Sequence, residues 1–250
     1  MLIPSLLAPR RPSGRHNGDP RASESSWSAV IAESLLDALA VLSPIACAGC
    51  GRADRALCLT CRAALRPTVT PRTLPPLTVY TALEYTGAVR ASLLALKEND
   101  RTDVARPLSR PLRAALSVVL RPGLEVVSVP PSRAAWRRRG YDPVALLCRG
   151  AGFHRSRVLV STRRTRSQKT LDEAARAVNL AGSLRATRTL MGRRFVLVDD
   201  VLTTGATLRE AHRAITEAGG EVECGVTLAF TPRIFQRTPL AGNVHSDNAG

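Results

Sequence analysis

Two adjacent carboxylates, Asp199 and Asp200, follow a short apolar run that begins at Phe195. Carboxylates at the end of a strand can accept hydrogen bonds from vicinal hydroxyls or lie beside a Mg²⁺ ion. The threonine-rich turn that comes next leads into a predicted helix, and backbone N–H groups at such a helix N-terminus form a phosphate cradle. The candidate phosphate-binding residues are those of the turn, Thr203, Thr204, Gly205, Ala206 and Thr207.

A ribose that carries a 5′-phosphate would satisfy both halves of this segment at once. Its hydroxyls would bind to the aspartates and its phosphate would bind in the turn. The alternative is an Asp-capped helix after a strand, which is ordinary in α/β proteins. Paired carboxylates and a turn with three threonines seldom coincide after an apolar run, so we favour the ribose phosphate site.

Four cysteines form a second candidate site, in two close pairs with a short turn between them. The predicted metal ligands are Cys47, Cys50, Cys58 and Cys61. Each C-x2-C pair can form a knuckle that offers two thiolates to one tetrahedral Zn²⁺, and in so small a module the metal would supply the folding energy. Disulfides are the alternative, which a reducing cytosol disfavours. We expect a structural zinc site that fastens this end of the chain onto its neighbour.

The chain is strongly basic, with 36 Lys and Arg against 20 Asp and Glu and a formal net charge of +16. Such an excess favours anionic partners such as nucleic acid or phosphates, although a coding bias towards arginine would also produce it. No run of 18 apolar residues exists, so the sequence predicts no membrane insertion. We expect a cytoplasmic protein.

Composition divides the whole chain into four parts. Residues 1–26 and 233–250 are predicted to be disordered, and residues 27–76 to hold an amphipathic helix, the cysteine module and a proline-rich linker that breaks regular structure. Residues 77–232 alternate between strand and helix patterns. We expect strands at 77–85, 124–129, 157–161, 194–198 and 222–230, and helices at 88–97, 104–120, 143–150, 171–178 and 206–218. This alternation predicts an α/β fold with a mostly parallel sheet and ligands at the carboxyl ends of its strands.

Several segments together resemble a known family. FVLVDDVLTTGATL resembles the phosphoribosyl pyrophosphate motif of type I phosphoribosyltransferases. The resemblance extends to the cysteine cluster and to three further segments, YTGAVRASLLALK ending at Lys97, VSVPPSRAAWRRRGYDP and TRSQKTLDEAARAVNLAGSL. Taken together, these features resemble the competence protein ComF family over roughly residues 40–232. The resemblance implies a type I phosphoribosyltransferase sheet preceded by a small zinc ribbon with four cysteine ligands.

The resemblance also implies roles for individual residues. Asp199 and Asp200 would be the catalytic pair that orients the ribose. The loop that meets pyrophosphate would contain Pro131, Ser132 and Arg133, with 137–139 nearby as counter-charge or, alternatively, as a solvated basic helix face. Residues 162–182 resemble a mobile lid in which Gln168 and Lys169 are the candidates, a flexible surface loop being the alternative. The chain departs from the family at Asp142-Pro143, where Asn-Gln is usual.

The function that the resemblance implies is Mg²⁺-dependent binding of phosphoribosyl pyrophosphate, or a related phosphorylated ribose, with transfer to an unidentified acceptor. The alternative is a non-catalytic accessory protein in DNA uptake or processing, which binds single-stranded DNA or proteins of the competence machinery. A third hypothesis is a regulator that senses nucleotides through the same pocket. No residue stands out as a base for an acceptor.

Overall fold

The computed structural model describes residues 45–162 and 181–232. Some of the predictions concern residues outside these ranges. They are the disordered segments 1–26 and 233–250, the helices at 27–42 and 171–178, and the lid residues Gln168 and Lys169.

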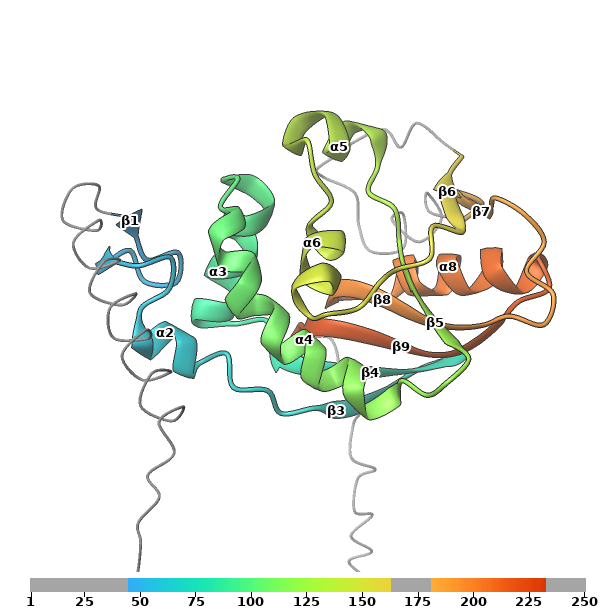
Figure 1. Ribbon diagram of the computed structural model, residues 1–250, viewed down its shortest axis with the longest axis horizontal. Helices are drawn as coiled ribbons and strands as arrows, with labels where there is room; N and C mark the ends of the chain where they lie inside the picture. The colour runs from blue at the N-terminus through green and yellow to red at the C-terminus, as the bar shows by residue number, and fades with distance from the viewer. Residues whose placement is uncertain (1–44, 163–180, 233–250) are drawn as a thin grey trace, which may run out of the picture. The chain divides into compact units, whose positions relative to one another are not determined.

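A five-stranded sheet forms the centre, with the order β3-β4-β9-β8-β5 (Figure 1). The strands are β3 (Thr70–Leu74), β4 (Leu77–Glu84), β5 (Leu124–Ser128), β8 (Arg194–Leu202) and β9 (Glu221–Phe230). β4, β9, β8 and β5 run parallel to one another, and only the edge strand β3 is antiparallel to its neighbour. The predicted α/β architecture with a mostly parallel sheet is confirmed.

The apolar run of β8 explains why this strand lies inside the sheet. Its four residues from Phe195 to Val198 are fully buried, as expected for a parallel strand that is covered on both faces. Because neighbouring side chains of a strand point to opposite faces, Phe195 and Leu197 pack in one apolar cluster, whereas Val196 and Val198 pack in another. The sheet therefore separates two layers of helix.

The helices lie where the sequence predicts them, except for an additional one at 133–139, and the apolar faces of the others assign them to these layers. They are α3 (Gly87–Glu98), α4 (Ala105–Val119, after a 3-10 turn at Thr102–Val104), α5 (Arg133–Arg139), α6 (Pro143–Gly150) and α8 (Ala206–Glu217). Buried residues of α3, α4 and α6 join the cluster that contains Val196, and those of α8 join the cluster that contains Phe195. None of the helices in the described ranges is long and apolar enough to span a bilayer.

The cysteine module precedes the sheet and contains β1 (Ile45–Ala46), β2 (Ala53–Asp54) and α2 (Leu59–Ala63). Its buried side chains, among them Leu57 and Leu65, belong to the same apolar cluster as those of α3 and α4. The module thus shares part of the core of the α/β region.

Two segments differ from expectation. The proline-rich linker was expected to break regular structure, but Thr70–Leu74 form β3, which pairs with β4 from Thr70↔Thr81 to Leu74↔Leu77. A proline is tolerated there because β3 is an edge strand. The strand at 157–161 is shorter, with β6 at Leu159–Ser161, and pairs antiparallel with β7 (Leu184–Ala186) outside the main sheet.

Candidate functional site

The four predicted cysteine ligands lie together. Their Sγ atoms are all within 4.8 Å of one another, and Cys50 and Cys58 are 3.8 Å apart. In a tetrahedral zinc site with Zn–S bonds of about 2.3 Å, the sulfurs are about 3.8 Å apart, so the cluster fits a metal such as zinc. A Cβ at Gly49 would lie 2.6 Å from the Sγ of Cys61, which explains the glycine. The predicted metal site is therefore supported by its geometry.

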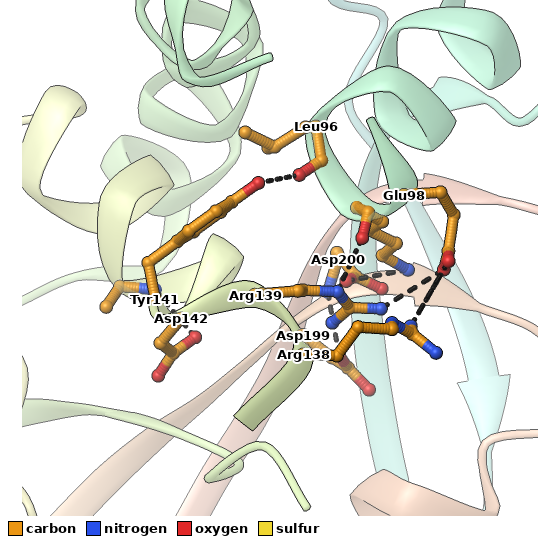
Figure 2. Close-up of polar contacts among 10 residues, drawn as sticks. Leu96, Glu98, Arg138, Arg139, Tyr141, Asp142, Asp199 and Asp200 are labelled. Atoms are coloured by element: carbon orange, nitrogen blue, oxygen red, sulfur yellow. Dashed lines mark hydrogen bonds and ion pairs between the residues drawn. The ribbon is translucent and has the colours of Figure 1, made fainter. Parts of the chain in front are cut away.

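The two predicted carboxylates lie near the carboxyl end of β8, and the end of α3 brings a cation to them. The Nζ of Lys97 is 2.8 Å from the Oδ2 of Asp200. The backbone N–H of Asp200 donates to the Oδ1 of Asp199 at 2.8 Å, which fixes the first carboxylate beside the second. The two aspartates lie close together (Figure 2), and both are partly buried.

Burial controls the charge of this cluster. Burial and, second to it, the negative charge of Asp200 together raise the pKa of Asp199 to about 7, since two carboxylates at one place disfavour each other's ionisation. For Lys97, burial works against the charged form, but the attraction of Asp200 and Asp199 outweighs it and the pKa is raised. One ammonium thus faces two carboxyl groups, which leaves room for hydroxyl donors or a divalent cation.

The threonine-rich turn follows directly after β8. Gly205 has a φ of 76°, in the left-handed region, and a Cβ there would lie 2.4 Å from a methyl carbon of Leu74. Only glycine fits both constraints. Thr204 accepts a hydrogen bond from the N–H of Ala206 at 3.3 Å through its Oγ1, and Thr203 is exposed. The N–H of Ala206, the first of α8, is thus taken by Thr204, and Gly205 supplies no side-chain cap for the N–H groups that follow it in the first turn.

The predicted pyrophosphate loop begins at the same edge of the sheet. Ser128 at the end of β5 pairs with Val198, so the loop starts beside the aspartates. The Oγ of Ser132 accepts the N–H of Ala135 at 3.2 Å and caps α5, while Arg133 is exposed. The parallel register of β5 and β8 therefore brings this loop and the carboxylates to one edge.

The arginines that were expected as counter-charge for pyrophosphate are divided by the structure. Arg138 and Arg139 both bind Glu98 at the end of α3, at 3.2 Å. Arg137 instead lines a hollow of about 310 Å³ with Arg133 and prolines of the loop. Arg133 and Arg137 therefore line the loop, whereas Arg138 and Arg139 pair with the end of α3, and the role of residues 137–139 as counter-charge for pyrophosphate stays a prediction.

Sequence reasoning missed two residues of the site. Lys97 entered only as the end of a family-like segment, because its contact with Asp200 joins elements far apart in the chain. Asp142, where the chain departs from the family, is buried; it accepts the N–H of Ala145 at 3.1 Å and pairs with Arg155 at 2.5 Å. An Asp-Pro pair at a helix start is the signal that could have revealed this cap.

The phosphoribosyl transferase domain family matches residues 147–233, which include the aspartates and the turn. This part of the chain is similar to a phosphoribosyl transferase domain. The chain is similar to the DNA utilization protein YhgH of Escherichia coli O157:H7, with 28% identity over 69% of this chain and 83% of that protein. The YhgH protein of Escherichia coli strain K12 is 29% identical, over 69% of this chain and 85% of that protein.

Among solved structures, the adenine phosphoribosyltransferase of Rhodothermus marinus is 17% identical and aligns with a TM-score of 0.34 over 68% of this chain and 86% of that one. The family match to the phosphoribosyl transferase domain and the likeness to the YhgH proteins confirm the resemblance that the motifs indicated.

Proposed function

We propose that this chain binds phosphoribosyl pyrophosphate together with Mg²⁺ at the carboxyl edge of its sheet. The observation that carries the proposal is the arrangement of Asp199 and Asp200 directly before the turn at the N-terminus of α8. A carboxylate pair suits the ribose hydroxyls, and the N–H groups of a helix's first turn suit the 5′-phosphate. A phosphorylated ribose carries both kinds of group.

Each part of the site has a task in this proposal. Asp199 and Asp200 orient the ribose, residues 203–207 bind the 5′-phosphate, and the loop with Arg133 binds pyrophosphate. The carboxylate oxygens are hard donors of the kind that Mg²⁺ prefers, and the ion would neutralise charge on the pyrophosphate. Lys97 holds the carboxylates in place and offsets their charge while no ligand is bound.

The reaction that such a site supports is transfer of the phosphoribosyl group. A lone pair of an acceptor attacks C1 of the ribose, the C1–O bond to pyrophosphate breaks, and the pyrophosphate leaves with the electron pair. The chain's contribution is to hold the ribose in line and to stabilise the developing charge of the leaving group through arginine. The acceptor is unidentified, so release of pyrophosphate across a panel of bases and amines is the assay for turnover.

Binding is tested by isothermal titration calorimetry of phosphoribosyl pyrophosphate with and without Mg²⁺. We expect Asp200→Asn to weaken binding by about tenfold or more and Thr204→Ala by about threefold or more. Asp103→Asn is the matched control, because Asp103 is an exposed carboxylate that pairs with Arg101 and belongs to neither the aspartate pair nor the turn. No Mg²⁺-dependent binding by the unmodified protein, or equal effects of Asp200→Asn and Asp103→Asn, would refute the proposal.

A second candidate function is the binding of single-stranded DNA, alongside or instead of turnover. A hollow of about 450 Å³ between α5 and α6 is lined by Trp136, Tyr141 and Phe153 and by the arginines 149, 155 and 157. Trp136 is 50% exposed, unusual for so large an apolar side chain. Aromatic rings that stack with bases, beside arginines that contact phosphates, are typical of surfaces for single strands. The relatives' name, DNA utilization protein, agrees with this candidate.

Fluorescence anisotropy with a labelled single-stranded oligonucleotide tests the DNA candidate. We expect binding that weakens steeply from low to high salt and that Trp136→Ala reduces by about fivefold or more. Met191→Ala is the control, since Met191 is also an exposed apolar side chain but lies outside the hollow. If salt leaves the affinity unchanged, or if both substitutions reduce it equally, this surface is excluded as the site for single-stranded DNA.

A further inference from the structure

Helix α5 is the least buried of the helices that bear on the site. None of its residues is buried, and Figure 1 shows it at the top of the molecule, away from the sheet. Apolar packing therefore cannot set its position. The loop that we propose for pyrophosphate leads directly into α5, with Ser132 as the cap. Whatever fixes α5 also fixes this loop.

Polar contacts at the other end of α5 supply that constraint. The Nε of Arg139 donates to the carbonyl of Lys97 at 2.5 Å, and the hydroxyl of Tyr141 donates to the carbonyl of Leu96 (Figure 2). The last carbonyls of a helix lack partners within it, so these two side chains satisfy groups that would otherwise stay open. Arg138 and Arg139 add contacts to Glu98. We call the contacts of Arg139 and Tyr141 with the end of α3 the α3–α5 clamp.

The clamp contacts Lys97, which also pairs with the aspartate carboxylates that we propose bind the ribose. Lys97 accepts the bond from Arg139 through its backbone and binds Asp200 through its ammonium group. Three parts of the site are thus joined in series: the aspartates, the end of α3, and α5 with its loop. The separation between the carboxylates and the loop depends on this connection.

We propose that Arg139 and Tyr141 are positioning residues that hold the pyrophosphate loop at the distance from Asp199 and Asp200 that selects phosphoribosyl pyrophosphate over ribose 5-phosphate. The inference rests on the proposed function. A ligand with pyrophosphate contacts both the aspartates and the loop and depends on their separation. Ribose 5-phosphate reaches only the aspartates and the turn at α8, so the clamp has little effect on it.

The exposed fractions of Arg138 and Arg139 indicate which of them contributes more to holding α5 against α3. The side chain of Arg139 is 13% exposed and that of Arg138 is 57% exposed, although both pair with Glu98. Exposed ion pairs contribute little, whereas a shielded hydrogen bond from a charged group to a carbonyl contributes more. Arg138 therefore provides a matched control that removes the same charge at the neighbouring position without breaking the bond to Lys97.

The experiment measures the affinities for phosphoribosyl pyrophosphate and for ribose 5-phosphate, both with Mg²⁺, by calorimetry. Arg139→Met is expected to weaken binding of the pyrophosphate ligand by about tenfold and Arg138→Met by less than about twofold. Tyr141→Phe, which changes no charge, is expected to weaken it by about threefold to fivefold. Tyr80→Phe is its control, because Tyr80 is a half-buried tyrosine of β4 that takes no part in the clamp. Affinity for ribose 5-phosphate is expected to stay within about twofold in every variant.

A merely structural role predicts another pattern. If Arg139→Met lowers the thermal midpoint but leaves the ratio of the two affinities unchanged, the inference is overturned. Equal effects of Arg139→Met and Arg138→Met also overturn it, because general charge would then be the cause. If phosphoribosyl pyrophosphate does not bind the unmodified protein, the proposed function is refuted. If it binds but Arg139→Met and Tyr141→Phe leave its affinity unchanged, this inference alone is refuted.

Discussion

Replacing Asp199 by asparagine is expected to make the ligand-free protein more stable while it abolishes binding of phosphoribosyl pyrophosphate. Burial and the charge of Asp200 raise the pKa of Asp199 from an ordinary value near 3.8 to about 7. The folded state therefore disfavours the ionised carboxylate, whereas the unfolded chain accepts it. Asparagine is neutral at every pH, and its Oδ1 can still accept the N–H of Asp200, which donates to Asp199 at 2.8 Å.

The sign of the pH dependence follows from the raised pKa. The unfolded state loses its proton near pH 3.8 and the folded state near pH 7, so the ionised group costs stability increasingly over that interval and by a constant amount above it. A shift of about three pKa units corresponds to about 4 kcal/mol. We expect Asp199→Asn to raise the free energy of unfolding by about 3 to 4 kcal/mol at pH 8 and by about 1 to 2 kcal/mol at pH 5.

Urea unfolding followed by circular dichroism, at both pH values and without added Mg²⁺, measures the difference between the variant and the unmodified protein. Asp103→Asn is the control, because its carboxylate is exposed and its loss is expected to change stability by less than about 0.5 kcal/mol. A gain in stability with a loss of binding is typical of a residue kept for function. No gain in stability at pH 8, or the same gain at pH 5 and pH 8, would show that the folded state does not disfavour the ionised carboxylate of Asp199.

Three other predictions test the surroundings of the site. Glu210→Ala is expected to lower the free energy of unfolding in urea by about 2 to 4 kcal/mol, because the buried carboxylate accepts the N–H of Leu184 at 2.9 Å; an unchanged midpoint would contradict this. Gly205→Ala should cost about 1 to 3 kcal/mol and weaken ligand binding, since the left-handed backbone and Leu74 leave no room for a Cβ. Metal analysis should find about one Zn²⁺ per chain, and less in Cys61→Ser.

Features set by neighbouring residues could be predicted from the sequence. A continuous apolar run from Phe195 to Val198 specifies a strand buried on both faces, and the aspartates and turn that follow must lie at its carboxyl end. The spacing of the cysteines likewise specifies a cluster, because each C-x2-C pair closes its own knuckle. In each case the determining contacts are made within a few residues of chain.

Other features depend on how distant elements meet. Lys97 reaches Asp200 only because α3 ends at the same edge of the sheet as β8. Arg139 donates to the carbonyl of Lys97, and such polar contacts position α5 because none of its residues is buried. The strand β3 exists because β4 offers an unpaired edge, which overrides the local effect of Pro71. The chemical groups of the site, and the strand and helix that carry them, follow from local residue patterns. Which cation faces the carboxylates, and which arginines line the loop, follows from packing between distant elements, because ion pairs and strand pairing over long separations are not encoded in local residue patterns.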